Sequence, residues 1–342
     1  MKTSNENIID ESITDERIAD ESITDESISD GNIVYESIRD GRRTQMLVEI
    51  RNLQVFYGRF QALDIDRTLE IREGERIGII GSNGAGKTTL VKTILGLTSY
   101  KGRIETRLKP QEMAAHLQFN QYVSTMTVRH VLETLLDTSI RTNQRLRDLI
   151  EYFEFEECLK KRYKSLSGGQ KQRLTIIMVM MQDAPLTFYD EVTSGLDFET
   201  RQRLMEKLLQ WYKGKNNTLC IVSHYYEELE LLANRLLILD QGKVIDYGEK
   251  EALFHKYCGE SIMTLDANEE NERLTASYQK LAAPSHLIAL ACREKAEEEE
   301  LAKLLIHHNV NFKRSNSDIE IMSINAKAAY AKEHGNGGVS ND

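Results

Sequence analysis

The chain has few of the features that mark a secreted or membrane-spanning protein. Its four cysteines, Cys158, Cys220, Cys258 and Cys292, are scattered with no C-x-x-C pair, which predicts free thiols in a reducing compartment and no zinc site. The apolar run at residues 176–181 is far shorter than the roughly 18 residues that a membrane-spanning helix needs. No basic region followed by an apolar stretch stands near the N-terminus, so we predict no targeting segment and a cytoplasmic protein.

The formal charge of −10 is concentrated at the N-terminus, since residues 1–40 contain twelve acidic and three basic side chains, a net of −9. These residues repeat with a period of five, which places an isoleucine at every fifth position from Ile13 to Ile38. That period fits neither the helical period of about 3.6 nor the strand period of about 2, so the isoleucines do not line one face. A β-helix with five-residue rungs is the alternative, but so few repeats would not bury a core. We therefore predict that residues 1–44 form a disordered acidic tail.

A phosphate-binding loop is predicted at residues 81–88, which read Gly-Ser-Asn-Gly-Ala-Gly-Lys-Thr and fit G-x-x-x-x-G-K-[ST]. A β-branched segment at 76–80 precedes the loop, and a helical pattern follows at 88–95. In this setting the glycines let backbone N–H groups surround phosphate oxygens. Lys87 is expected to reach the β- and γ-phosphates, and the Thr88 hydroxyl to ligate Mg²⁺. The structural alternative is a Gly-rich turn with an unrelated lysine. The predicted loop residues are Gly81, Ser82, Asn83, Gly84, Ala85, Gly86, Lys87, Thr88 and Thr89.

A second anion-binding pattern lies at residues 166–173, which read Leu-Ser-Gly-Gly-Gln-Lys-Gln-Arg. Its hydroxyl, its exposed backbone N–H groups and the dipole of the following helix all favour negative charge. The segment resembles the signature sequence of ATP-binding cassette proteins. In that family two subunits pack head to tail, and the signature of one closes over the γ-phosphate at the other's phosphate loop. The resemblance implies an ATP site that is incomplete in a monomer, with four signature residues in contact with nucleotide: Ser167, Gly168, Gly169 and Gln170.

The segment 186–191, Leu-Thr-Phe-Tyr-Asp-Glu, resembles the strand that carries the family's second phosphate-site motif. The resemblance implies that Asp190 holds Mg²⁺ through water and that Glu191 polarises the attacking water as a general base. A solvated loop start after a strand is the structural alternative. Residues 193–197 resemble the family's D-loop, which places Asp197 at the nucleotide. Where the family usually has proline after the glutamate, this chain has Val192, a change that affects loop rigidity rather than chemistry.

Three further positions match family residues that touch the nucleotide. His224 follows the apolar strand 219–223 and matches the switch histidine, so the resemblance implies that it is catalytic together with Glu191 and Lys87, with a structural histidine after a strand as the alternative. Tyr57 matches the aromatic residue that stacks on adenine, although it could instead be a half-buried strand residue. Gln118 matches the Q-loop glutamine, a ligand of Mg²⁺ in a loop that touches the membrane subunit, and Gln121 remains the alternative.

The predicted fold class is α/β, a RecA-like P-loop ATPase core with antiparallel β and α-helical subdomains. We assign the cassette to residues 46–260, with a helical insert at about 119–165 and a hairpin at 236–245. Residues 275–325 are predicted to be a small β-α-β extension, in which strands at 286–291 and 318–322 flank a helix at 294–308. Residues 326–342 are predicted to be a tail.

These resemblances imply an ATPase subunit that uses ATP and Mg²⁺. We expect it to form a homodimer or heterodimer and to drive separate integral membrane permease subunits from the inner face of the cell membrane, with no nucleic acid partner. The short insert, without a long regulatory domain, favours an exporter of drugs, peptides or lantibiotic-like compounds. The alternative is a soluble cassette ATPase for assembly or remodelling, similar to iron–sulfur assembly ATPases. Membrane spans encoded by a neighbouring reading frame would separate these two hypotheses.

Overall fold

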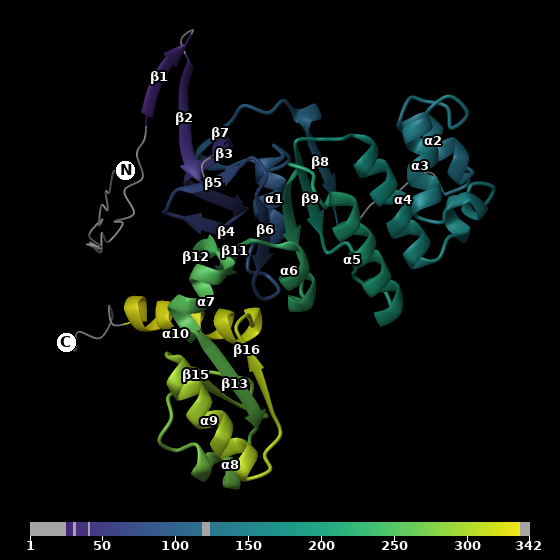
Figure 1. The fold of residues 1–342 in the computed structure, drawn as a ribbon. Helices are drawn as coiled ribbons and strands as arrows, with labels where there is room; N and C mark the ends of the chain where they lie inside the picture. The colour runs from purple at the N-terminus through teal and green to yellow at the C-terminus, as the bar shows by residue number, and fades with distance from the viewer. Residues whose placement is uncertain (1–24, 30–31, 40–41, 118–123, 336–342) are drawn as a thin grey trace, which may run out of the picture. The chain divides into compact units, whose positions relative to one another are not determined.

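The computed structural model describes residues 25–29, 32–39, 42–117 and 124–335 (Figure 1). The chain divides into two units, Met1–Gln45 and Met46–Asp342, which we describe separately. Within the described residues, no helix combines the length and apolar character that crossing a membrane requires. All four cysteines are buried and free of disulfides, as predicted.

The first unit contains an antiparallel ladder. Strand β1 (Asp25–Ser29) pairs with β2 (Asn32–Arg39), and β2 pairs with the start of β3 (Arg42–Tyr57). The structure therefore corrects the expectation of disorder for these stretches, while residues 1–24 lie outside the described part. The five-residue period excluded a shared apolar face, but main-chain pairing between strands does not require one. Ile and Val also favour the extended backbone.

An antiparallel sheet opens the second unit. From Met46 onward, β3 pairs with β4 (Phe60–Ile65), β5 (Leu69–Arg72) and β7 (Lys101–Thr106). Val48 and Ile50 point into the core, and a register shift then brings Leu53 and Val55 to the same side. The shift coincides with the left-handed backbone of Asn52, whose φ is 48°. The extra residue of such a bulge moves the alternation by one position, which explains the broken apolar spacing.

The second sheet of this unit is the larger framework for the helices. Its strand order is β12-β11-β6-β10-β9-β8, and every pair is parallel except β11 with β12. The strands are β6 (Arg76–Ile80), β8 (Met113–His116), β9 (Leu186–Asp190), β10 (Thr218–Val222), β11 (Arg235–Asp240) and β12 (Lys243–Glu249). Every residue of β9 and β10 is buried, as parallel strands covered on both faces require. The segments that follow β6, β9 and β10 leave the sheet at one edge.

Helices cover this sheet and connect its strands. The helices that follow its strands are α1 (Lys87–Ile94), α5 (Phe198–Tyr212), α6 (Tyr226–Leu232) and α7 (Lys250–Cys258). Leu90 and Val91 of α1 belong to one apolar cluster with Ile79 of β6 and Val48 of β3. The two sheets are therefore joined through α1, which fixes the segment where α1 begins.

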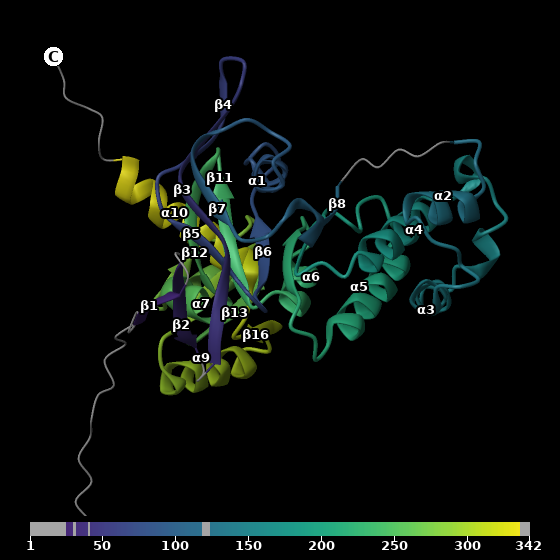
Figure 2. The ribbon, with the colours of Figure 1, turned by 90° about the horizontal axis from the view of Figure 1, so that it is seen from above.

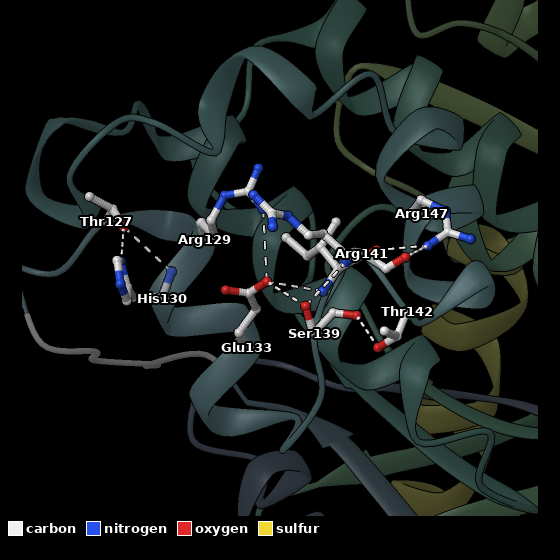
Figure 3. A network of polar contacts seen from close by, with 9 residues as sticks. Thr127, Arg129, His130, Glu133, Ser139, Arg141, Thr142 and Arg147 are labelled. Carbon is white, nitrogen blue, oxygen red and sulfur yellow. Dashed lines mark hydrogen bonds and ion pairs between the residues drawn. The ribbon is translucent and has the colours of Figure 1, made fainter.

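A helical part contains α2 (Val128–Leu135), α3 (Gln144–Tyr152) and α4 (Gly168–Met181), seen from a second direction in Figure 2. Its core includes the fully buried side chains of Leu132, Leu149 and Phe153, as their helical spacing predicted. A polar network closes the turn between α2 and α3 (Figure 3). Glu133 Oε1 accepts hydrogen bonds from Ser139 Oγ at 3.3 Å and from the backbone N–H of Ile140 at 3.0 Å. These bonds give the turn a defined shape.

The C-terminal region forms a four-stranded antiparallel sheet of order β14-β15-β13-β16. Its elements follow one another as β13 (Ser261–Asp266), α8 (Glu269–Leu274), β14 (Lys280–Leu281), β15 (Leu287–Cys292), α9 (Lys295–His307) and β16 (Phe312–Ser315). The predicted strand and helix at 286–291 and 294–308 correspond to β15 and α9. The arrangement is β-α-β-β-α-β rather than β-α-β, because β13, β14 and β16 gave no clear signal.

The predicted strand at 318–322 is wrong. These residues begin helix α10 (Ile319–Gly335), and Asp318 Oδ1 accepts a hydrogen bond from the backbone N–H of Ile321 at 3.0 Å. The alternating Ile319 and Ile321 suggested a strand, but Ile319, Met322 and Ala326 share one buried helical face. The helix also covers residues 326–335, which we expected to be a tail, while 336–342 lie outside the described part.

Candidate nucleotide site

The predicted phosphate loop lies between the end of β6 and the start of α1. Gly86 precedes α1 with a φ of 101°, and a Cβ there would come within 2.5 Å of the Leu63 side chain. A Cβ on Gly81 would lie 2.4 Å from the backbone oxygen of Leu239. Both positions therefore require glycine, because any larger residue would push the loop away from the strands beside it.

Lys87 lies at the centre of this loop. Its Nζ donates hydrogen bonds to the backbone oxygens of Gly81 at 2.8 Å and Ser82 at 3.1 Å. Burial lowers the pKa of Lys87, and the nearby carboxylates Glu191 and Asp190 oppose that effect. The loop's own carbonyl groups thus hold a cation beside its backbone N–H groups, an arrangement suited to phosphate.

Asp190 ends β9 directly beside the loop and is fully buried. Its Oδ2 accepts a hydrogen bond of 2.7 Å from Thr88 Oγ1. Its Oδ1 has no hydrogen-bond partner among the residues that the structure describes. Burial raises the pKa of Asp190, and the Thr88 hydrogen bond opposes this rise. An unsatisfied carboxylate oxygen next to a hydroxyl supplies the hard oxygen ligands that Mg²⁺ prefers, so these residues fit that ion.

Glu191 follows Asp190 in a left-handed backbone conformation, with a φ of 52°. Its backbone N–H donates to the Val222 oxygen at 2.9 Å, and its own oxygen accepts from the Ser194 N–H at 3.0 Å. The side chain of His224, just beyond β10, lies with Nε2 at 2.5 Å from Glu191 Oε1. A non-glycine residue in this conformation is strained, and strained residues are frequent at functional sites, where the backbone must hold a side chain in one direction. In this conformation the Glu191 carboxylate contacts His224 and lines the cleft at the phosphate loop.

Glu228 connects the segments that carry Glu191 and His224, and sequence reasoning gave it no role. Its side chain is 4% exposed and accepts hydrogen bonds of 2.6 Å from both Thr193 Oγ1 and Ser223 Oγ. Burial raises the pKa of Glu228, and the two hydroxyl groups oppose this rise. The carboxyl group links the segment after Glu191 to the residue before His224. Acidic residues in a first helical turn are common, so no pattern in the sequence set Glu228 apart.

A cleft of about 290 Å³ connects the loop to the antiparallel sheet. It is lined by Tyr57, Phe60 and Ala62, by loop residues 83–89 and by Glu191. Tyr57 is 49% exposed and Phe60 is 65% exposed, so two aromatic rings, not one, are available for stacking. Phe60 was missed because it stands just beyond the turn at Gly58, outside the matched pattern.

The predicted signature residues lie apart from this cleft. Ser167 begins α4, where its hydroxyl accepts from the Gln170 N–H at 3.3 Å and Gln170 Oε1 accepts from the Ser167 N–H at 3.1 Å. Asp197 caps α5 in a similar way, accepting from the Thr200 N–H at 2.9 Å. Among described residues, the cleft lining includes none of Ser167, Gly168, Gly169, Gln170 and Asp197. Gln118 and Gln121 lie outside the described residues.

Comparison with known proteins agrees with this geometry. Residues 66–194 match the family model described as ABC transporter. The chain is 30% identical to a methionine import ATP-binding protein of Clostridium tetani, over 72% of this chain and 85% of that protein. It is 26% identical to a linearmycin resistance ATP-binding protein of Bacillus subtilis, over 77% of this chain and 91% of that protein. A Nod factor export ATP-binding protein of Rhizobium johnstonii shares 31% identity, over 60% and 71% of the two chains.

Solved structures show the same fold. The ATP-binding subunit of an ABC transporter superimposes with a TM-score of 0.55 and 25% identity, covering 62% of this chain and 93% of that one. A dimeric bacterial ABC transporter cassette gives a TM-score of 0.53 with 22% identity, covering 59% and 98%. The predicted α/β cassette with antiparallel and helical parts is thereby confirmed.

Proposed function

The chain belongs to the ABC transporter family of ATP-binding proteins, and from this premise we propose how its residues hydrolyse ATP and which partners they serve. The observation that carries the proposal is the line of contacts from Thr88 through Asp190 and Glu191 to His224. It places a hydroxyl, a buried carboxylate, a candidate base and an imidazole in sequence beside one phosphate loop.

The proposed reaction is attack of water on the γ-phosphate. Glu191 orients the water and takes its proton, and His224 holds the Glu191 carboxylate through the 2.5 Å contact. Lys87 and the loop N–H groups neutralise the β- and γ-phosphates, so that ADP leaves as the O–P bond breaks. Thr88 and Asp190, with Gln118 as a third candidate, would hold Mg²⁺, which would supply charge neutralisation for the phosphates. Tyr57 and Phe60 would stack on the adenine.

The signature residues are proposed to complete the site of a second copy. Ser167, Gly168 and Gly169 lie at the start of α4 and are not among the residues that line the chain's own cleft. A head-to-tail dimer would bring them to the partner's γ-phosphate, as the family resemblance implies. Asp197, at the start of α5, would lie at the same junction. The dimer is built either from two copies of this chain or from this chain and a homologous cassette.

Transport requires integral membrane permease subunits, which we propose as further partners on the inner face of the cell membrane. Relatives are named for methionine import, linearmycin resistance and Nod factor export, so both directions occur among them. The two names linked to resistance and export support an exporter.

The proposal is tested by purifying the protein from detergent extracts and measuring ATP turnover with and without Mg²⁺. We expect membrane proteins with several spans to co-purify and turnover to require the ion. Asp190→Asn should abolish the Mg²⁺ dependence by lowering turnover to background, because the buried carboxylate is lost. If the purified protein hydrolyses ATP but no membrane protein co-purifies with it, an assembly or remodelling ATPase would be favoured instead.

A further inference from the structure

Helix α10 ends the described chain and packs on the cassette as well as on the C-terminal sheet. Ile319, Ile321, Met322 and Ala326 are buried in the same apolar cluster as residues of α6 and α7, and that cluster also includes Ile262 and Ala289 of the C-terminal sheet. Figures 1 and 2 show α10 beside α7 and β12. The last helix of the extension therefore shares an apolar core with the ATPase cassette.

The start of α10 is attached to the helix that follows His224. Glu230 of α6 accepts a hydrogen bond from the backbone N–H of Ile319 at 3.0 Å and another from the Ser317 hydroxyl. Lys250 of α7 lies 3.5 Å from the same carboxylate. Because Glu230 lies in the helix that begins two residues after His224, α10 has a fixed position relative to the switch histidine.

Further along, α10 reaches the hairpin beside the phosphate loop. Lys327 Nζ lies 3.2 Å from Asp240 Oδ1, at the end of β11. The same Oδ1 accepts a hydrogen bond of 3.2 Å from Ser82 Oγ in the phosphate loop. The hairpin turn is also held to the loop by a 3.1 Å bond from the Gly242 N–H to the Ala85 oxygen. A continuous path of polar contacts thus connects α10 to the loop through one carboxylate.

We propose that Lys327 is a positioning residue of the phosphate loop, acting through Asp240 on Ser82, and that ATP affinity therefore depends on α10. The ammonium group orients the Asp240 carboxylate toward Ser82 and compensates a negative charge that would otherwise repel phosphate. The inference rests on the proposed ATPase function, because it concerns that same site.

The effect should be modest, because the Lys327 and Asp240 side chains are 31% and 30% exposed and solvent screens their interaction. In the full-length protein, Lys327→Met should weaken ATP binding and raise KM about two- to fivefold, while kcat changes less. Lys327→Arg should restore the affinity. Lys332→Met is the matched control, since Lys332 lies on the exposed end of the same helix.

A double-mutant cycle separates positioning from general loss of structure. In an Asp240→Asn background, Lys327→Met should add no further loss of affinity, and the coupling should shrink at high salt. Equal melting temperatures for the Lys327→Met and Lys332→Met variants would exclude unfolding as the cause. Equal KM values for these two variants, in a protein whose wild type binds ATP, would overturn the inference. A wild type that binds no ATP would instead overturn the proposed function.

Discussion

The phosphate-loop cleft and the C-terminal region use charged residues in opposite ways. In the cleft, Asp190 is fully buried, and Lys87 and Glu191 are largely withdrawn from water. In the C-terminal region, ion pairs such as Arg273 with Glu269 lie on the surface. Burying charge is costly unless partners compensate, whereas exposed pairs contribute little to stability. The buried charges of the cleft therefore lower the stability of the fold but provide the groups that the reaction needs. The C-terminal sheet is stabilised by its apolar core.

The largest expected effect falls on the cleft. Lys87→Ala removes the cation that the Gly81 and Ser82 oxygens hold at the loop. Nucleotide affinity should fall by roughly a hundredfold and turnover should reach background, because buried charge interactions with phosphate are strong. Equilibrium binding of ATP to the purified variant measures this. An ATP affinity within twofold of the wild-type value would show that Lys87 does not contact the nucleotide.

The next effect tests whether Glu228 organises the cleft. Glu228→Ala removes the acceptor for Thr193 and Ser223, so turnover should fall about ten- to hundredfold through displacement of Glu191 and His224. The loss of stability should be about 1–3 kcal/mol, because two buried hydroxyl groups lose their partner. Glu228→Gln should retain much of both, since an amide can still bond to both hydroxyls. Denaturant unfolding and steady-state kinetics of the two variants would show whether a side chain that keeps the shape and the hydrogen bonds of Glu228, but not its carboxylate, is sufficient.

The same residue gives a pH prediction. Burial raises the pKa of Glu228, so the folded protein favours the neutral carboxyl. Its contribution to stability is fully present below the unfolded pKa of about 4.3 and is lost as pH rises through the folded value. The unfolding free energy of the wild type relative to Glu228→Gln should therefore decline with rising pH in that window. A difference that grows with pH would mean that the charged form is the favoured one.

The motifs predicted which residues meet at the cleft, and the structure shows why they could not predict the rest. Lys87, Thr88, Asp190 and Glu191 follow strands in a short local pattern, and parallel strands bring such patterns to one edge. Glu228 contacts Thr193 and Lys327 contacts Asp240 across a large separation in the sequence, which leaves no local spacing to recognise. The C-terminal helix was misread at Ile319 and Ile321 because two apolar residues in alternation suit either a strand or a helix until packing decides.

A smaller effect on turnover is expected from the C-terminal core. Leu301 of α9 is fully buried against the sheet, so Leu301→Ala should destabilise that region by about 2–5 kcal/mol. ATP turnover per folded molecule should change by less than twofold, because the residue is remote from the cleft. Thermal unfolding combined with turnover measured well below the transition tests this. A large fall in kcat below the transition would show that the C-terminal sheet itself contributes to catalysis.

The smallest effect is expected from the acidic repeat. All residues that line the cleft belong to the second unit, so removal of residues 1–43 should leave turnover and melting temperature nearly unchanged. Full-length and truncated proteins should be compared across a salt series, because interactions of exposed carboxylates are screened beyond a Debye length of about 8 Å at physiological ionic strength. A truncation that alters turnover only at low salt would reveal electrostatic autoregulation by the repeat.

The most direct test of the central claim is Glu191→Gln in the full-length protein. The amide keeps the size of the side chain but cannot accept the proton of the attacking water. We predict that ATP binding is retained, that turnover falls by about a hundredfold or more, and that ATP stabilises a dimer detectable by light scattering. Turnover at the wild-type rate would contradict the assignment of Glu191 as the base and, with it, the proposed mechanism of the cleft.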